Sequence, residues 1–470
     1  MSEQQHTEGL SNDFCISEKI AAFACSLKSS DIPEPVRARA RLLMLDSIGI
    51  ALASHGYDFS RKAMAAICEL NSGQDSVVIG SEIKMDLRNA ILMNGILIHG
   101  LDYDDTHAQG VIHATTSILP TVLAVGAQKG CSGEDMLTAY ILGVEIATRL
   151  GAVAKGGFHQ VGFHPTGLIG TFGCTVATGW LLGLNPTQYR DAQGLALSLA
   201  SGSLEFLNDG AWNKRMHPGW AGFSGVTAAT MGKHGYTGTR LAYEGRFGLY
   251  ESHLVGNDQY DLALATKDLG LVWEVERVSV KPLPACHFTH ASIDAAIRLH
   301  AKGLRPTEIK RIKVLVPEGV VKTVCEPEAS KKIPANSYEA QFSIPYLVST
   351  ALLKGRLTLD DIDEPALHDP ETLALAAITE YQIDSDSAFP KYFDGEVIVE
   401  MKDGRIERER EPINRGAVDR PLTSDDIRKK YLENALRQVS RERAVEIENK
   451  ILNLESGSAK ELTGILEKKI

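Results

Sequence analysis

The sequence lacks the features that mark several large classes of protein. Its seven cysteines are scattered and include no Cys-x-x-Cys pair, so neither a disulfide framework nor a cysteine zinc site is indicated. No run of lysine and arginine forms a basic arm, and the net charge of −11 argues against a nucleic-acid surface. The first residues show neither the basic nor the apolar segment of a secretory signal. We therefore expect a cytoplasmic protein that binds neither nucleic acid nor a membrane.

Motifs for common cofactors and nucleophiles are also missing. The chain has no G-x-x-x-x-G-K-[ST], no G-x-S-x-G and no H-E-x-x-H. The glycines around Gly167 follow no predicted strand, which argues against dinucleotide binding. Its aspartates and histidines match no familiar metal-site spacing. We predict no metal and no cofactor, and acid–base chemistry carried by side chains alone.

Helices dominate the first part of the chain. With 470 residues, 44% of them hydrophobic, the chain is long enough for a large core and two domains. Prolines 33 and 35, Ser132 with Asp135, and Asn185 with Pro186 all resemble helix starts. The uncharged stretch 167–184 approaches the length of a membrane span, but its glycines and threonines favour a helix buried in a tightly packed core.

The pattern changes near residue 278. The β-branched segment 309–316 predicts a strand, and 396–401 with 406–409 predicts a hairpin on an Asp-Gly turn. Segments 289–302 and 342–353 favour helices. The highly charged end of the chain does so too, from 424 onward and over 440–454. The predicted fold class is therefore mostly α: a large all-helical domain plus a smaller α+β lid domain. We place the helical domain at 1–275, the lid at 276–410 and returning C-terminal helices at 411–470.

Two clusters of ionisable residues stand out in the helical part. The segment 99–116 holds Asp102, Asp104, Asp105, Thr106 and three histidines, one of them His113. So many acids and bases together are typical of a site that moves protons, although single aspartates there could merely cap a helix. His164 precedes Pro165 at a helix entrance, where it could act as a cap or offer the helix N-terminus to a carboxylate.

Two further clusters carry positive charge. Lys214, Arg215 and His217 lie together before a small-residue helix, and arginine can hold a carboxylate with two hydrogen bonds. A solvated surface pair is the alternative. Lys281 opens the proline-rich loop that ends at Cys286, near the predicted domain junction. Nothing near Cys286 completes a nucleophilic triad.

Four ordered motifs carry a resemblance to a known family. The runs D-Y-D-D-T-H, G-F-H-P-T-G, N-K-R-M-H-P-G and K-P-L-P-A-C resemble those of the MmgE/PrpD family, and the resemblance covers nearly the whole chain. That family includes 2-methylcitrate dehydratase, cis-aconitate decarboxylase and iminodisuccinate epimerase. The resemblance implies a large helical domain built from both chain ends, a smaller α+β lid, an active site in the cleft between them, and a homodimer.

The resemblance also implies roles for single residues. Asp102, Thr106 and His113 match the family's first active-site stretch, His164 its second, Lys214 the lysine of the third, and Lys281 the lysine at the lid. We predict catalytic roles for Asp102, His113, His164 and Lys214. The residues predicted to bind substrate are Thr106, Arg215, His217, Lys281 and Cys286.

The chain departs from the decarboxylases of the family at two places. These tend to have a histidine where this loop has Cys286, and a lid tyrosine for which the chain offers Tyr338 or Tyr346. Both departures weaken the decarboxylase interpretation.

The residues and the resemblance agree on one kind of reaction, removal of a proton next to a carboxylate of a small di- or tricarboxylic acid. His113 or Asp102 would act as base, and the cations would stabilise the charge that develops. Our leading hypothesis is a cofactor-independent lyase, a 2-methylcitrate-type dehydratase. The alternative is a cis-aconitate-type decarboxylase or an epimerase of a related polycarboxylate. A non-catalytic carboxylate-binding homologue is a further alternative.

Overall fold

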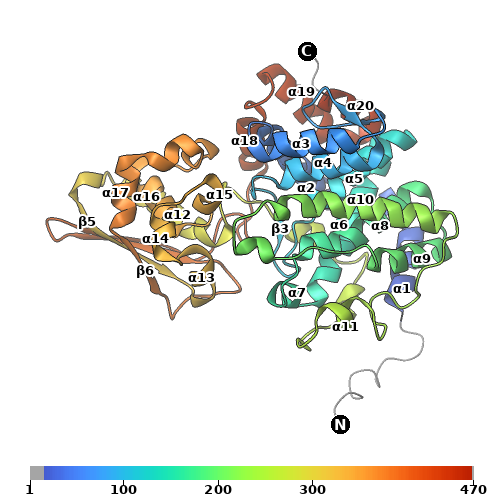
Figure 1. The fold of residues 1–470 in the computed structure, drawn as a ribbon, viewed down its shortest axis with the longest axis horizontal. Coiled ribbons are helices and arrows are strands. Elements are labelled where there is room, and N and C mark those ends of the chain that lie inside the picture. Colours follow the sequence, from blue (N-terminus) through green and yellow to red (C-terminus); the bar gives the residue numbers. More distant parts are fainter. Residues whose placement is uncertain (1–14, 468–470) are drawn as a thin grey trace, which may run out of the picture. The chain divides into compact units, whose positions relative to one another are not determined.

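We describe residues 15–467 in a computed structural model (Figure 1). The expectation for the first residues of the chain falls largely outside this range. Helices make up 58% of the structure and strands 9%, which confirms the mostly α fold with a smaller α+β part. Contacts between residues divide the chain into two compact units. Unit 1 comprises Met1–Gly100, Asp104–Val278 and Arg428–Ile470, and unit 2 comprises Leu101–Tyr103 and Ser279–Ile427.

Unit 1 is helical apart from very short strands. Its elements are α1 (Ile16–Ser26), α2 (Glu34–Ser54), α3 (Asp58–Leu70), β1 (Ser76–Val77), β2 (Lys84–Met85), α4 (Leu87–His99), β3 (Thr106–His107), α5 (Thr115–Lys129), α6 (Gly133–Val153), α7 (Gly157–Gln160), α8 (Pro165–Leu182), α9 (Pro186–Leu197), α10 (Asn213–Lys233), α11 (Leu249–His253), the later part of α18 (Ser424–Ala435), α19 (Arg441–Leu452) and α20 (Ala459–Leu466). The C-terminal helices α19 and α20 pack on α2 and α5 from the start of the chain (Figure 1).

Helix α8 forms the centre of unit 1. It packs against α5, α6, α9 and α10, and all its residues except Trp180 and Leu182 are buried. Pro165 occupies its first turn, and Gly183 ends it with a left-handed backbone at φ 68°. The apolar stretch identified in the sequence is therefore a core helix, as predicted. Helix α6 is also long and apolar enough to cross a membrane, but 94% of its apolar window is buried inside the protein.

Side-chain caps fix where several helices begin. Ser132 accepts a hydrogen bond from the backbone N–H of Asp135 at the start of α6. Asn185 and Gln188 form a reciprocal capping box at the start of α9. Both starts were predicted from these residue types, because their side-chain oxygens satisfy backbone N–H groups that the helix leaves free.

Glycines allow α10 to lie unusually close to its neighbours. A Cβ atom at Gly95 of α4 would lie 2.4 Å from the Cα atom of Gly219 in α10. A Cβ atom at Gly167 of α8 would lie 3.0 Å from the Cβ atom of His217. The first contact tolerates no side chain and the second leaves almost no room for one, so the helix spacing depends on glycine at these positions. This close packing brings the end of α4, the start of α8 and the start of α10 together.

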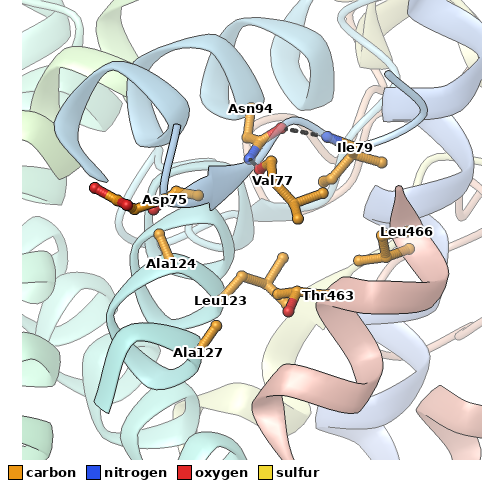
Figure 2. Close-up of a pocket in the computed structure, with 10 residues that line it drawn as sticks. Asp75, Val77, Ile79, Asn94, Leu123, Ala124, Ala127, Thr463 and Leu466 are labelled. Carbon is orange, nitrogen blue, oxygen red and sulfur yellow. Dashed lines mark hydrogen bonds between the residues drawn. The ribbon is translucent and has the colours of Figure 1, made fainter. Parts of the chain in front are cut away.

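A small enclosed cavity lies between α4, α5, α20 and β1 (Figure 2). Asn94 holds the strand above it: its Oδ1 accepts from the N–H of Ile79 at 2.8 Å, and its Nδ2 donates to the carbonyl of Val77 at 2.9 Å. The cavity volume is about 30 Å³, which is room for water and not for a polycarboxylic acid. The functional residues must therefore be sought elsewhere in the unit.

Unit 2 combines a mixed sheet with helices. Its elements are α12 (His290–Ala301), β5 (Ile309–Val316), α13 (Val321–Val324), α14 (Glu328–Lys332), α15 (Ser337–Ala340), α16 (Ile344–Lys354), α17 (Pro370–Ala377), β6 (Thr379–Ile383), β7 (Gly395–Met401) and β8 (Ile406–Glu411), and the two-residue strand β4 (Val278–Ser279) stands at the sequence boundary between the units. The strand order is β6-β5-β7-β8, with β5 and β6 parallel and the other pairs antiparallel. Helices α12 and α16 cover the sheet (Figure 1).

The predicted strand and hairpin are confirmed in unit 2. The turn between β7 and β8 contains Asp403 and Gly404, whose φ of 88° is the left-handed conformation that such a turn needs. Strand β6 was not predicted. Its sequence, Thr-Glu-Tyr-Gln-Ile, mixes polar and apolar residues without the β-branched run of β5.

Candidate active site

Four histidines of unit 1 meet where three helices and a loop come together, and we call them the histidine cluster. His99 ends α4, His113 lies just before α5, His164 is the N-cap of α8, and His217 lies in the second turn of α10. The ring centroids of His99 lie 4.8 Å from His113 and 5.6 Å from His164, and those of His164 and His217 are 5.2 Å apart. Segments separated by more than a hundred residues thus form one group of imidazoles.

A buried carboxylate orients two of these rings. The Nδ1 atom of His99 lies 2.8 Å from Oδ2 of Asp104, and the Nδ1 atom of His113 lies 3.4 Å from the same oxygen. His113 Nδ1 is also 2.7 Å from the carbonyl of Asp105 and 3.5 Å from the hydroxyl of Thr106. Because carboxylates and carbonyls only accept, His113 donates through Nδ1 and keeps Nε2 for other partners.

Asp105 lies beside this group but is turned toward a helix. Its carboxylate accepts from the backbone N–H of Thr115 at 3.3 Å and from the Thr115 hydroxyl, which also contacts the hydroxyl of Tyr140. A carboxylate at this place also faces the positive end of α5. Burial nevertheless raises the pKa of Asp105 to about 7. Asp105 can therefore exchange a proton near neutral pH.

Burial keeps two members of the cluster uncharged. The Nδ1 atoms of His164 and His217 lie 3.0 Å apart, so one ring donates a proton to the other. Burial lowers the pKa of His164 well below its ordinary value and lowers that of His217 to about 4. The positive charges of Lys214 and of neighbouring histidines lower both further. At neutral pH the pair is neutral and adjoins one fixed ammonium group.

Arg215 points to a different part of unit 1. Its Nε donates to the carbonyl of Gly100 at 2.8 Å, and its guanidinium lies 4.4 Å from the ring centroid of Phe59. These contacts hold the end of α4, where His99 is placed. A role for Arg215 in substrate binding stays a prediction.

The loop between His99 and His113 is itself under constraint. His107 accepts from the N–H of Gly110 through Nδ1 at 3.1 Å, so its Nε2 donates to Glu274 at 3.0 Å. Val111, a β-branched residue, has a left-handed backbone with φ 51°. Such a conformation costs a valine on the order of 1–3 kcal/mol, and strain of this kind gathers at functional sites.

Unit 2 holds a second polar group, built around an ion pair. Lys281 Nζ donates to Oδ1 of Asp102 at 3.1 Å and to the Asp102 carbonyl at 2.7 Å, and both side chains are buried. Asp102 adopts φ 50°. It belongs to the three-residue segment Leu101–Tyr103, which Gln341 and the carbonyl of Pro282 also hold.

Two buried histidines accompany this ion pair. The rings of His287 and His290 are 4.9 Å apart. His287 Nε2 contacts the amide of Asn414 at 2.9 Å, and His290 Nε2 donates to the carbonyl of Ala285 at 3.0 Å. Burial lowers the pKa of His287 to about 3 and that of His290 well below its ordinary value, and the charge of Lys281 adds to both effects.

The remaining candidates of unit 2 are set into its backbone framework. Cys286 is buried and its N–H donates to the carbonyl of Gln341 at 2.8 Å. The hydroxyl of Tyr346 donates to the carbonyls of Asp361 and Ala366, each at 3.0 Å. Tyr346 is therefore engaged in the packing of α16. Tyr338, the other lid tyrosine considered, has its ring tilted by 50° against that of Phe342, with the ring centroids 5.1 Å apart.

The predicted site residues thus fall into two groups. Those in unit 1 are Thr106, His113, His164, Lys214, Arg215 and His217, and those in unit 2 are Asp102, Lys281 and Cys286. The sequence predicts no individual role for His99, His287 or His290, and for Asp104 and Asp105 it leaves open a role as helix caps. Asp104 and Asp105 lie within the first motif, and the three histidines lie just outside two of the motifs. Only the fold shows that His99 and Asp104 meet.

Comparison with known proteins identifies the chain. The model of the MmgE/PrpD N-terminal domain matches residues 18–261, and that of the MmgE/PrpD C-terminal domain matches residues 283–455. The chain belongs to the MmgE/PrpD family. The resemblance drawn from the four motifs is therefore confirmed.

The relatives of this MmgE/PrpD protein include cis-aconitate decarboxylases and 2-methylcitrate dehydratases. The chain is 28% identical to the cis-aconitate decarboxylase of Homo sapiens, over 94% of this chain and 92% of the relative. It is 27% identical to a cis-aconitate decarboxylase-like protein of Aspergillus oryzae, over 94% and 95%. Similarity to the 2-methylcitrate dehydratase of Escherichia coli is lower, 24% over 80% of this chain and 83% of the relative.

Proposed function

We propose that this protein is a cofactor-independent lyase that decarboxylates a small unsaturated tricarboxylic acid of the cis-aconitate type. The observation that carries the proposal is the histidine cluster, in which neutral imidazoles adjoin the ammonium group of Lys214. Such a group can hold a polyanion and deliver a proton in one place. The identity and coverage of the decarboxylase relatives support this reaction over dehydration, which the sequence analysis had placed first.

The charge arrangement suits a substrate with several carboxylates. Lys214 places a positive charge near His164 and His217. An incoming carboxylate favours the protonated form of a nearby imidazole, so substrate binding raises the pKa of these histidines. The cluster thus becomes more positive in response to the anion, and binding takes up protons from solution.

His113 is the proposed proton donor. Its Nδ1 is held by the carbonyl of Asp105, so its Nε2 is the atom that meets the substrate. In the reaction, the bond to one carboxylate carbon breaks and CO₂ leaves. The freed electron pair forms a new double bond, and a carbon of the former double bond takes the Nε2 proton of the protonated His113 ring. The neutral ring that remains then regains a proton from solvent. Asp102 is less suited to this step because Lys281 pairs with its carboxylate.

Dehydration is the second candidate, and one residue favours it. Cys286 stands where the decarboxylases of the family tend to have a histidine. With a hydroxylated tricarboxylate such as 2-methylcitrate, the same cluster would remove a proton beside a carboxylate, and water would leave from the adjacent carbon.

The test is an assay of the full chain against cis-aconitate and 2-methylcitrate in D₂O, followed by proton NMR. We expect CO₂ release and one deuterium in the product from cis-aconitate. Loss of water from 2-methylcitrate with no CO₂ from cis-aconitate would make the protein a dehydratase. Absence of both products and of deuterium exchange would contradict a lyase and favour a non-catalytic homologue.

A matched pair of lysines on α10 tests the role of charge. Lys214→Ala should raise KM and lower kcat together, because it removes stabilisation of both the bound substrate and the transition state. Lys233→Ala, at the far end of the same helix, should leave both unchanged. Equal kinetics for the two variants would show that the charge of Lys214 plays no part.

We further propose that the protein forms a homodimer through α10. Trp212, Met216 and Trp220 recur at helical spacing on this helix, and they are 40%, 44% and 37% exposed. Phe223 extends the stripe and stacks on Trp220, with ring centroids 5.1 Å apart. Aromatic residues and methionine are enriched in interfaces. Sedimentation equilibrium should show a dimer for the native chain and a monomer for Trp220→Glu.

A further inference from the structure

Three imidazoles of the histidine cluster are spaced for a metal ion. One ring nitrogen from each of His99, His113 and His164 lies within 4.8 Å of the other two. Zinc–nitrogen bonds of about 2.0–2.1 Å in a tetrahedral site place ligand nitrogens about 3.3 Å apart. The widest pair must therefore close by about 1.5 Å, a shift within reach of side-chain rotation.

Two of these rings are already oriented as metal ligands usually are. The Nδ1 atom of His99 faces the carboxylate of Asp104 at 2.8 Å, and that of His113 faces the carbonyl of Asp105 at 2.7 Å. Each acceptor fixes the proton on Nδ1 and leaves the lone pair on Nε2. Histidines that bind zinc commonly donate their other N–H to a carboxylate or a carbonyl in this way.

The third ring can adopt the same state. His164 Nδ1 lies 3.0 Å from His217 Nδ1, and when His164 donates, its own Nε2 carries the lone pair.

A buried nitrogen without a partner is the independent observation. Among the described residues, His99 Nε2 has no hydrogen-bond partner, and His99 is 1% exposed. An unpartnered buried polar atom costs free energy that a ligand would recover.

We propose that the histidine cluster binds one divalent transition-metal ion of the Zn²⁺ type through His99, His113 and His164. Three imidazoles leave a fourth position for water or a substrate carboxylate. The sequence showed no such site because the three ligands come from the end of α4, the loop before α5 and the start of α8.

The bound ion acts as a reversible inhibitor, and this second step rests on the proposed function. Proton delivery needs the Nε2 atom of His113, and a metal ion occupies the lone pair of that atom. Metal binding and proton transfer therefore exclude one another.

The binding test uses the untagged full chain and the metal alone. Calorimetry with Zn²⁺ should show one tight site, and Co²⁺ should give the intense visible absorption of a tetrahedral complex instead of the weak absorption of an octahedral one. His99→Gln and His164→Gln should each weaken Zn²⁺ binding by at least about 100-fold, and Asp104→Asn by roughly 10–100-fold. The exposed His234→Gln is the matched control and should bind as the native chain does.

The outcomes separate this inference from the proposed function. Variants that stay folded by circular dichroism and keep native Zn²⁺ affinity would overturn the site, as would an octahedral Co²⁺ spectrum, whatever the turnover. With an active enzyme, one equivalent of Zn²⁺ should abolish turnover and a chelator should restore it. Full activity of the Zn²⁺-loaded protein would overturn the inhibition. If the metal-free protein showed no turnover but still bound Zn²⁺ as expected, the result would count against the proposed function alone.

Discussion

Unit 1 and unit 2 both bury neutral imidazoles, and they differ in the acids that accompany them. In unit 1, burial raises the pKa of Asp105 and Glu145 to about 7, in the same unit as His164 and His217. In unit 2, hydrogen bonds from Thr372 and Arg298 lower the pKa of the partly exposed Asp369 and Glu409. Asp105 and Glu145 of unit 1 can therefore change protonation near neutral pH, whereas Asp369 and Glu409 of unit 2 stay charged there.

This difference suggests that unit 1 carries the acid–base chemistry and that unit 2 binds and stabilises. Groups that exchange protons suit acid–base chemistry, and they are found where the family motifs place His113 and His164. The Lys281–Asp102 pair with its two neutral histidines suits binding and rigidity. The four predictions below test that division, from the largest expected effect to the smallest.

Removing the proposed proton donor of unit 1 should have the largest effect. His113→Asn should lower kcat by about 100- to 10,000-fold, the range for loss of a general acid, and change KM little. The exposed His234→Asn is the control. Steady-state kinetics across pH 5–9 measure both, and a variant that retains native kcat would move the proton chemistry away from unit 1.

Breaking the ion pair of unit 2 should be the largest change in stability. Lys281→Met removes the ammonium group that pairs with the buried Asp102 carboxylate, which costs about 3–5 kcal/mol. The double variant Lys281→Met with Asp102→Asn should recover most of this loss, because no uncompensated charge is left. Denaturant unfolding measures both, and a loss under 1 kcal/mol for the single variant would show that the pair is not structural.

Acid should destabilise unit 2 before unit 1. The pKa of His287 falls from about 6.5 when unfolded to about 3 when folded, so the unfolded chain binds more protons below pH 6.5. Its contribution is fully present above pH 6.5, and about 2 kcal/mol is lost by pH 5. His164 and His217 of unit 1 lose stability with the same sign as His287. Asp105 and Glu145 offset this loss, because their raised pKa destabilises unit 1 at pH 7 and the penalty disappears as the pH falls toward 4.

Amide hydrogen exchange at pH 7 and pH 5, corrected for intrinsic rates, measures the change in stability of each unit separately. Protection should fall in β5 and β7 of unit 2 and change less in α8 of unit 1. An equal loss of protection in both units would contradict the proposed difference in how their titratable groups respond to acid.

The smallest expected effect is the release of strain at Val111. Glycine adopts a φ of 51° without penalty, so Val111→Gly should stabilise unit 1 by up to about 1 kcal/mol after the loss of apolar contact is included. Val161→Gly, at φ −90° after α7, is the control and should destabilise. Thermal unfolding measures both.

Features of this fold that depend on local sequence could be predicted. Features that depend on pairing between distant segments mostly could not. Caps such as Ser132 and Asn185 act within one turn, so helix starts could be read from the sequence. Strand β6 was missed because its pairing with β5, and not its own residue types, makes it a strand. The partners of Asp102 and His99 were missed for the same reason. Lys281 is distant in the sequence from Asp102, and the contact between His99 and Asp104 depends on how the loop after α4 turns.

The contact between α4 and α10 has a consequence for mutational scans of this protein. Hydrogen is the only side chain that fits between Gly95 and Gly219, so even a single methyl group would act as a wedge near the ends of α4 and α10. A scan scored by turnover would rank these two glycines with the histidines, although neither carries a group that binds or transfers anything. Their importance would be that of a spacer, and it would be mistaken for chemistry unless protein abundance were measured alongside.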